Sequence, residues 1–496
     1  MNEYIPSKVG ILIVGAGPTG LGAATRLHQR DEHDWILVDS GERAGGLSDT
    51  QITPEGFHFD MGGHVIFSHF DYFDDLLNIA VGTCEKHWNT LQRVSYIWFK
   101  NRYVPYPFQN NLYCLDLDDQ LRCINGLIDS TSLQRNITPT TFEEWIDHSL
   151  GTGIGDVFMR PYNFKVWAYP TNLLNCTWLG ERVSTVDMKR VIRNVLLKQP
   201  DEGWGPNAVF RFPRNGGTGG IWSRVASRLP EKRLFFNMTV SNIDFDNKFA
   251  YFSDGSRVRY ESLICTAPLD DTLRWLGRGD LARRLRYSST HVIGIGLRGF
   301  NPHDKKCWMY YPESSTPFYR ATVFSAYAEE NCPEAEACLP TIRFAAGQPT
   351  PAPEDTRPRP GPYWSIMFEV SESVEFKPVD SDCIVEETIK GALRANLIEP
   401  NDEIVSIFHK RLLKGYPTPH IERDSVLEEA LPLLKKKGVW SRGRFGAWKY
   451  EVGNQDHSVM QGVEAVDNIL DGTPETTLEF PNLVNGRRNS DLRMSA

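Results

Sequence analysis

The 496-residue sequence lacks the features that mark membrane-spanning, secreted or nucleic-acid-binding proteins. No segment has the apolar length of a membrane-spanning helix. The apolar segment 10–14 is too short for a signal peptide and lacks the flanking residues of one. The formal net charge is −9, which makes a nucleic-acid surface improbable. We therefore expect a cytoplasmic protein with neither a membrane span nor a nucleic-acid partner.

The cysteine pattern argues against disulfides and zinc. The nine cysteines are odd in number, lie scattered along the chain and form no C-x-x-C pair. Reduced thiols are the simplest interpretation, and no metal site is predicted.

The clearest positive signal is the glycine-rich segment 15–22, GAGPTGLG, directly after the strand-like run 9–14. Glycines allow the backbone to turn tightly and approach a pyrophosphate, whose charge then lies at the start of the following helix. Asp39 ends the next apolar run, about twenty residues on, where it could accept a hydrogen bond from a ribose hydroxyl. The dinucleotide contacts predicted here are Gly15, Gly17, Pro18, Thr19, Gly20, Asp39 and Ser40.

Two later glycine pairs favour FAD over NAD. Gly45-Gly46 and Gly62-Gly63 would bring a second stretch of backbone close to a long cofactor. An NAD dehydrogenase would continue with alternating strands and helices, whereas this chain continues into a polar, aromatic stretch. A plain surface turn at Gly45-Gly46 remains the alternative. The added cofactor contacts predicted here are Gly45, Gly46, Leu47, Gly62, Gly63 and His64.

Motifs of common hydrolytic sites are missing. The sequence contains no G-x-S-x-G, no H-E-x-x-H and no carboxylate pair that stands out for glycosyl transfer. Chemistry carried by a flavin needs none of these residues.

The order of apolar patterns predicts an α/β protein of three parts without internal repeats. A Rossmann-like FAD-binding domain would be assembled from residues 1–95, 208–290 and 430–496. A helical insertion domain would span 110–205, and an antiparallel β-sheet domain would comprise 96–109 and 291–429. The Pro-rich stretch 349–362 is interpreted as a surface insertion without regular structure.

Aromatic residues and arginines gather in polar, Pro- and Gly-rich surroundings. The clusters lie at 103–110, 160–167, 178–182, 307–311 and 448–450. Stacking holds a base or nicotinamide ring, and guanidinium forks and phenol hydroxyls hold a diphosphate. Each cluster alone is more simply core packing, but the set favours a ligand.

The sequences of these clusters closely resemble the corresponding segments of the eukaryotic UDP-galactopyranose mutases, especially the fungal type. The resemblance spans nearly the whole chain, and its most specific segments are 62–68, 105–110, 160–165 and 453–458. It implies conversion of UDP-galactopyranose to UDP-galactofuranose without net oxidation. In that family the N5 atom of reduced FAD attacks the anomeric carbon and displaces UDP. A cofactor that acts as the nucleophile would explain why no amino-acid nucleophile is evident.

Residue roles follow from the same resemblance. Arg182 and Arg320 match the diphosphate-binding arginines, and His64 matches a histidine against the flavin; these three are the predicted catalytic residues. Tyr416 and Tyr450 match phenols on the diphosphate. The remaining predicted substrate contacts are Phe67, Tyr106, Gln109, Asn163, Trp167, Asn207, Trp308, Tyr310 and Asn454. A second FAD cradle would comprise Gly453, Asn454, Gln455 and Ser458. NADPH as reductant would use the substrate cleft and contact Arg93, Ser95, Tyr310 and Arg444.

Mobility, assembly and biological role are also implied by the resemblance. Segments 180–187 and 203–207 match mobile flaps that would close over the substrate. A homo-oligomer, as in the tetrameric fungal relatives, is expected, and galactofuranose would feed surface glycoconjugates such as those of a cell wall. Two other functions stay open: an amine oxidase or desaturase-like flavin oxidoreductase, and a non-catalytic FAD-binding scaffold.

Overall fold

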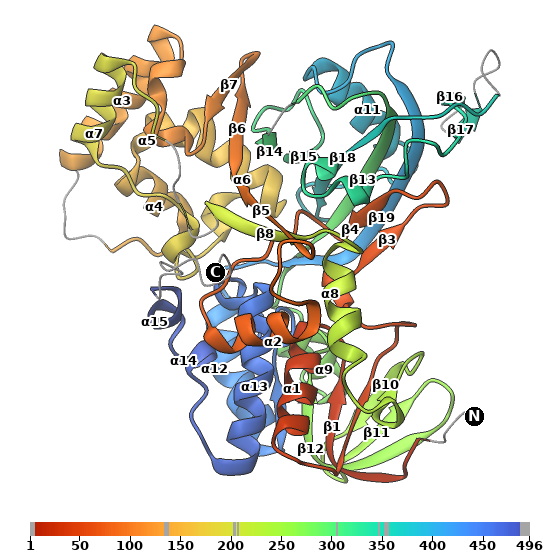
Figure 1. Ribbon diagram of the computed structural model, residues 1–496. Coiled ribbons are helices and arrows are strands. Elements are labelled where there is room, and N and C mark those ends of the chain that lie inside the picture. Colours follow the sequence, from red (N-terminus) through yellow and green to blue (C-terminus); the bar gives the residue numbers. More distant parts are fainter. Residues whose placement is uncertain are drawn as a thin grey trace.

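The computed structural model describes residues 5–132, 138–201, 205, 208–303, 306–345, 348–351 and 357–486. In Figure 1 a mainly parallel sheet lies below, an antiparallel sheet lies at the upper right, and a helical region lies at the upper left. Among the described helices, none combines the length and apolar composition that a bilayer crossing requires.

The first sheet joins strands that are far apart in the sequence. Its order is β10-β11-β12-β1-β2-β9, and β20 also pairs with β12. Pairing is parallel from β12 through β1 and β2 to β9 and between β12 and β20, and antiparallel along β10-β11-β12. The strands are β1 (Lys8–Val14), β2 (Trp35–Val38), β9 (Leu234–Phe235), β10 (Val240–Asp244), β11 (Phe249–Phe252), β12 (Arg257–Cys265) and β20 (Val439–Ser441).

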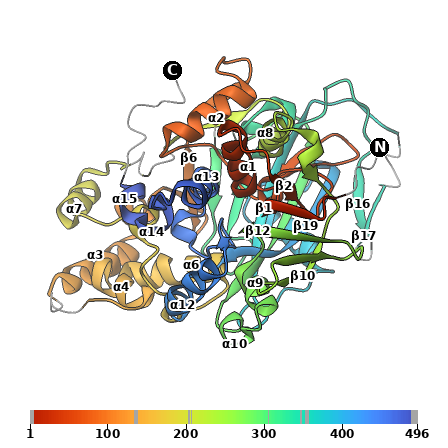
Figure 2. The ribbon, with the colours of Figure 1, turned by 90° about the horizontal axis from the view of Figure 1, so that it is seen from below.

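Helices cover both faces of this sheet. Alternate residues of β1 point to opposite faces, and since both sets are apolar, both faces must be buried. Ile11 and Ile13 enter one buried cluster, and Leu12 and Val14 enter another. Figure 2 shows α1, α8 and α13 on one side of β1 and β12, and α9, α10 and α12 on the other. The helices are α1 (Pro18–Gln29), α2 (Asp71–Val81), α8 (Gly217–Ala226), α9 (Leu269–Trp275), α10 (Gly279–Ala282), α12 (Arg423–Lys436) and α13 (Gln455–Asp471).

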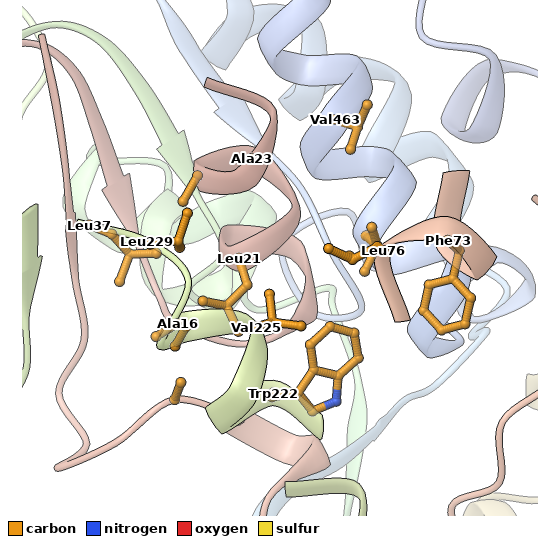
Figure 3. Close-up of a cluster of buried hydrophobic side chains, with 14 of the residues drawn as sticks. Ala16, Leu21, Ala23, Leu37, Phe73, Leu76, Trp222, Val225, Leu229 and Val463 are labelled. Atoms are coloured by element: carbon orange, nitrogen blue, oxygen red, sulfur yellow. The ribbon is translucent and has the colours of Figure 1, made fainter. Parts of the chain in front are cut away.

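The core on the α1 side is continuous across these helices. Figure 3 shows Leu21 of α1 beside Trp222 and Val225 of α8, with Leu76 of α2 close by. Helices α1 and α13 approach closely because glycine lies at the crossing: a Cβ atom on Gly462 would lie 2.0 Å from the carbonyl oxygen of Thr19. The amino ends of both helices therefore lie next to each other.

The second sheet has the order β19-β13-β18-β15-β14-β6-β7, and only the β14–β6 pair is parallel. Helix α11 (Ile384–Arg394) contributes Ile384 and Ile389 to the core on one face of this sheet. The strands are β6 (Val94–Phe99), β7 (Arg102–Pro105), β13 (Tyr287–Arg298), β14 (Lys306–Tyr310), β15 (Arg320–Thr322), β18 (Tyr363–Glu372) and β19 (Glu403–Pro417).

Three two-stranded sheets complete the β structure of the described residues. They pair β3 (Thr50–Ile52) with β4 (His58–Asp60), β5 (Trp88–Gln92) with β8 (Val209–Pro213), and β16 (Ile342–Ala345) with β17 (Gln348–Pro351). Strand β17 corrects one expectation, because the start of the Pro-rich stretch 349–362 is a strand rather than irregular chain. Pro349 and Pro351 are tolerated there because each strand of a two-stranded ribbon is an edge.

The helical region packs around aromatic residues, among them Phe108, Phe142, Phe158 and Trp167. It contains α3 (Leu117–Ser132), α4 (Phe142–Ser149), α5 (Gly151–Ile154), a π-helix (Gly155–Met159), α6 (Arg160–Trp167) and α7 (Met188–Leu197). At the other end of the described chain, α14 (Thr476–Glu479) and α15 (Pro481–Asn485) follow α13. Helix α15 also contacts the short 3₁₀ helix η6 (Gly180–Arg182).

Candidate active site

A cavity of about 1020 Å³ lies where the three regions meet. Val14 and Val38 place the carboxyl ends of β1 and β2 at one end of it, and residues of α6, β14 and β19 line the remainder. In open α/β sheets ligands bind beyond the carboxyl ends of the strands. The cavity is therefore the candidate active site.

The predicted dinucleotide turn forms one wall of this cavity. Gly15, Gly17, Pro18 and Thr19 line it, as do Asp39 and Ser40 at the end of β2. The Asp39 carboxylate accepts hydrogen bonds from the backbone N–H groups of Ala16 (2.6 Å) and Gly41 (2.6 Å). Gly20 does not line the cavity. A Cβ atom there would lie 1.8 Å from the Gly15 carbonyl oxygen, so this glycine permits close packing of helix on strand.

The second glycine pair packs directly against the first turn. The N–H group of Gly45 donates to the carbonyl of Ala16 at 2.9 Å, and the Cα atom of Gly17 lies close to Gly46. Gly46 and Leu47 line the cavity, whereas Gly45 lies one layer behind. The pair is thus built into the wall of the nucleotide cleft and is not an isolated surface turn.

Two helix amino ends face the cavity. Helix α1 begins at Pro18, and α13 begins after Asn454, its N-cap residue. Gly453, Asn454, Gln455 and Ser458 line the cavity, and Gln455 accepts a hydrogen bond from the Trp222 indole at 2.8 Å. Unpaired N–H groups at the start of a helix favour negative charge. This end of the cavity suits phosphate groups.

His64 lies on the loop that follows β4. Gly62, Gly63 and His64 all line the cavity. The Nδ1 atom of His64 is buried without a hydrogen-bond partner among the described residues. Burial lowers the pKa of His64 to about 4, so the ring is neutral at pH 7. A neutral imidazole with an unused nitrogen can bond to a ligand placed in the cavity.

Glu369 of β18, which the sequence reasoning missed, organises this loop. It is 2% exposed and accepts hydrogen bonds from the N–H group of Gly63 (2.7 Å) and the hydroxyl of Tyr319 (2.5 Å). Arg320 approaches both of its carboxylate oxygens, at 2.6 and 2.8 Å. Burial opposes ionisation of Glu369, but the charge of Arg320 and these hydrogen bonds hold its pKa below the usual value. A lone acid inside the apolar run 364–370 was the available sequence signal.

Arg182 and Arg444 carry positive charge that no carboxylate neutralises within the described part of the chain. Arg182 donates to the Asn454 side chain at 2.9 Å and to the Glu451 carbonyl at 3.0 Å. Arg444 donates only to carbonyl oxygens. The Arg444 guanidinium lies 4.8 Å from the centre of the Tyr416 ring, and Arg182 lies 5.1 Å from that of Tyr450. Two such cations beside two phenols can bind an anion.

Further aromatic residues line the cavity. The rings of Tyr106 and Tyr310 lie 5.5 Å apart, and Arg93 lies over Tyr106 at 4.9 Å. The buried indole nitrogen of Trp308 has no hydrogen-bond partner among the described residues, and Arg320 lies 5.5 Å from the Trp308 ring. The predicted substrate contacts that line this cavity are Phe67, Tyr106, Gln109, Asn163, Trp167, Arg182, Trp308, Tyr310, Arg320, Tyr416, Tyr450 and Asn454.

Besides Gly20 and Gly45, two other predicted residues, Ser95 and Asn207, are not found in this lining. Ser95 is buried on β6, and its hydroxyl has no partner among the described residues, but it does not line the cavity. Asn207 lies outside the described residues, as does most of the predicted flap 203–207. In the other predicted flap, Arg182, Val183 and Ser184 line the cavity.

Comparison with known proteins agrees with this geometry. Residues 13–79 match the family model of the NAD(P)-binding Rossmann-like domain. The whole chain is similar to a crystal structure of a reduced UDP-galactopyranose mutase, with 46% identity, a TM-score of 0.88, and coverage of 97% of this chain and 98% of that one.

More distant similarities concern the fold alone. A putative protoporphyrinogen oxidase from Exiguobacterium sp. 255-15 has 13% identity and a TM-score of 0.66 over 94% of this chain and 99% of its own. A putrescine oxidase has 13% identity and a TM-score of 0.57 over 93% and 99%. The level of identity and the near-complete coverage of the first relative establish the relationship: the chain belongs to the UDP-galactopyranose mutase family.

Proposed function

We propose that the protein binds FAD and UDP-galactose in this cavity and interconverts UDP-galactopyranose and UDP-galactofuranose without net oxidation. The observation that carries the proposal is one cavity that joins two glycine loops and two helix amino ends to the uncompensated cations Arg182 and Arg444. Such a cavity fits a dinucleotide and a second diphosphate side by side.

The residues around the cleft fit FAD. Asp39 already accepts two backbone hydrogen bonds, and its carboxylate retains capacity for a ribose hydroxyl. His64 and Trp308 each present a buried nitrogen without a partner among the described residues. The proposed FAD contacts are Gly15, Gly17, Pro18, Thr19, Asp39, Ser40, Gly46, Leu47, Gly62, Gly63, His64, Gly453, Asn454, Gln455 and Ser458, with Gly20 and Gly45 supporting the two turns from behind. These residues would hold FAD, which in its reduced form would supply a nucleophilic nitrogen for the anomeric carbon of the sugar.

The chain's own residues bind the nucleotide and stabilise its departing charge. Arg182 and Arg444 attract the diphosphate, and the hydroxyl groups of Tyr416 and Tyr450 donate to its oxygens. Arg320 contributes directed N–H donors, although Glu369 offsets its net charge. Phe67, Tyr106, Gln109, Asn163 and Trp167 are the proposed uridine contacts; Asn207, Trp308, Tyr310 and Asn454 are the proposed sugar contacts.

Exclusion of water is the proposed task of the segments 180–187 and 203–207. Closing over the sugar would protect the anomeric carbon from hydrolysis. His64 would lie beside the flavin ring of FAD. Because the imidazole is neutral, it would add no charge to the cavity.

NADPH is the proposed reductant and would enter the same cavity before the substrate. Arg93, Tyr310 and Arg444 line the cavity and could contact it. Ser95 would contribute only after a local rearrangement, because it does not line the cavity in this structure. We further propose a fungal-type, cytoplasmic enzyme that assembles into a homo-oligomer and supplies galactofuranose to surface glycoconjugates.

One experiment tests the proposed reaction. FAD-loaded protein is reduced with dithionite under nitrogen, mixed with UDP-galactofuranose, and assayed for the pyranose isomer by chromatography; oxidised protein is the matched control. We expect product only from the reduced protein. Equal isomerisation by oxidised protein would contradict the proposal, and oxidation of an amine without any isomerisation would support the oxidoreductase alternative.

A further inference from the structure

A single turn of chain holds Arg182 in place. This turn is the 3₁₀ helix η10 (Tyr450–Val452) together with the two residues that follow it. The Arg182 guanidinium lies over the Tyr450 ring. It donates hydrogen bonds to the Glu451 carbonyl at 3.0 Å and to the Asn454 side chain at 2.9 Å. Within the described residues, the guanidinium group of Arg182 has no hydrogen-bond partner other than Glu451 and Asn454. The direction of its guanidinium is therefore set by this turn.

A buried ion pair between Arg423 and Glu451 anchors this turn. The Glu451 carboxylate accepts hydrogen bonds from Nη1 and Nη2 of Arg423, at 2.9 and 3.1 Å. Arg423, on α12, is 1% exposed and Glu451 is 5% exposed. Arg423 also donates to the Thr177 hydroxyl at 2.8 Å, and Asp424 accepts its Nε at 2.7 Å. The pair thus joins α12, η10 and the helical region.

Neither member of the pair lines the cavity. A buried ion pair loses so much hydration that apolar residues of similar volume often serve stability equally well or better. What the ion pair contributes instead is orientation. Two parallel hydrogen bonds fix both carboxylate oxygens of Glu451. Fixing that side chain also fixes the adjacent peptide carbonyl, which is the acceptor for Arg182.

We propose that Arg423 and Glu451 are positioning residues that aim Arg182 at the nucleotide diphosphate and so set the affinity of the cavity for UDP. The inference rests on the proposed function, since it takes a nucleoside diphosphate as the ligand. Arg423 and Glu451 act only through Arg182; they touch neither the ligand nor the cofactor.

The test replaces both charges together, Arg423→Met with Glu451→Met, so that no lone charge is left buried. The FAD-loaded protein is titrated with UDP by calorimetry. We expect the dissociation constant to rise about tenfold or more, while FAD content stays within about twofold of the unchanged protein. In an Arg182→Ala background the same double replacement should change the UDP dissociation constant less than twofold, because its effect runs through Arg182.

A second buried pair provides the matched control. Arg442 and Glu475 are 4% and 2% exposed, and the Nη2 atom of Arg442 lies 2.7 Å from the Glu475 carboxylate. No contact between this pair and Arg182 is found among the described residues. Replacing both with Met should leave the UDP dissociation constant within about twofold, even where the melting temperature falls.

The results separate the inference from the proposed function. Failure of the unchanged protein to bind UDP would overturn the proposed function. Normal UDP binding by the Arg423→Met, Glu451→Met protein, or an effect that is equally large in the Arg182→Ala background, would overturn the positioning role alone. If that double variant yields no folded protein, Glu451→Gln replaces it. This variant keeps one acceptor oxygen for Arg423, and we expect a threefold or larger rise; no change would overturn the inference.

Discussion

Asp60 provides a sharp test of how the loop that carries His64 is supported. It ends β4, just before Gly62, and its side chain is fully buried. Its carboxyl group lies 2.5 Å from the Thr50 hydroxyl and 2.9 Å from the Thr218 hydroxyl, and it accepts the N–H group of Thr218 at the start of α8. Burial raises the pKa of Asp60 to about 7, although these hydrogen bonds partly oppose the rise. The loop that carries His64 is thus supported by an acid that is still partly protonated near neutral pH.

The size of the effect follows from linkage. The ordinary pKa is 3.8, so the unfolded chain loses this proton well before the folded chain does. Stability therefore falls as pH rises from about 4 to 7, by about 4 kcal/mol in all, and stays low above pH 7. About 2 kcal/mol of this loss falls between pH 5.5 and 8.5. Asp60→Asn imitates the protonated acid and has no proton to lose, so the variant should not show this loss.

The assay is thermal unfolding of FAD-loaded protein at pH 5.5 and 8.5, comparing Asp60→Asn with the unchanged chain. We expect the variant to gain stability relative to the unchanged chain as pH rises. A difference in melting temperature that is the same at both pH values would refute the reasoning.

Asp456→Asn is the contrasting control. Burial opposes the charge of Asp456, but the neighbouring His457 and a hydrogen bond from His69 hold its pKa below the usual value. Its removal should lower the melting temperature at both pH values.

Three other predictions follow from the geometry. Arg320→Ala should lower turnover of the reduced enzyme by about a hundredfold or more if its N–H groups stabilise departing diphosphate charge, and near-normal turnover in a steady-state assay would contradict that role. His64 should stay neutral from pH 5.5 to 8, so its ring proton signals in a nuclear magnetic resonance titration should not move; a midpoint near 6.5 would contradict the burial argument. Gly294→Ala should lower the free energy of unfolding in urea by about 1–3 kcal/mol, because the new Cβ atom would lie 2.6 Å from the Phe59 ring. Gly279→Ala, whose nearest neighbour is 3.5 Å away, should cost less than Gly294→Ala, and equal losses would refute the steric account.

Sequence reasoning succeeded where the signal is local. The turn at 15–20 needs only a strand, closely spaced glycines and a helix in succession, and all three are contiguous in the chain. Arg182 and Tyr450 are different: their roles came from the resemblance to a family, because nothing in their immediate neighbours shows that they meet at 5.1 Å.

What the sequence could not reveal depends on contacts between distant segments. Glu369 meets Gly63 across 306 positions of chain, and Arg423 meets Glu451 from a separate helix. Strand β19, 15 residues long, was not predicted, because its burial is uneven along its length and gives no clear alternation. Strand β17 was missed because its prolines argue against a strand unless the pairing shows that it is an edge.

The charge balance of the cavity changes the relative importance of its arginines. Sequence reasoning treated Arg182 and Arg320 as equivalent diphosphate ligands. In the structure Arg320 faces a buried carboxylate at 2.6 Å, so the pair adds little net charge at a distance. Arg182 and Arg444 meet only neutral oxygens among the described residues, so their fields act on an approaching anion almost undiminished. Attraction of a nucleotide should therefore depend on Arg182 and Arg444, whereas Arg320, held in one orientation by Glu369, is suited to stabilising charge that develops only as the bond breaks.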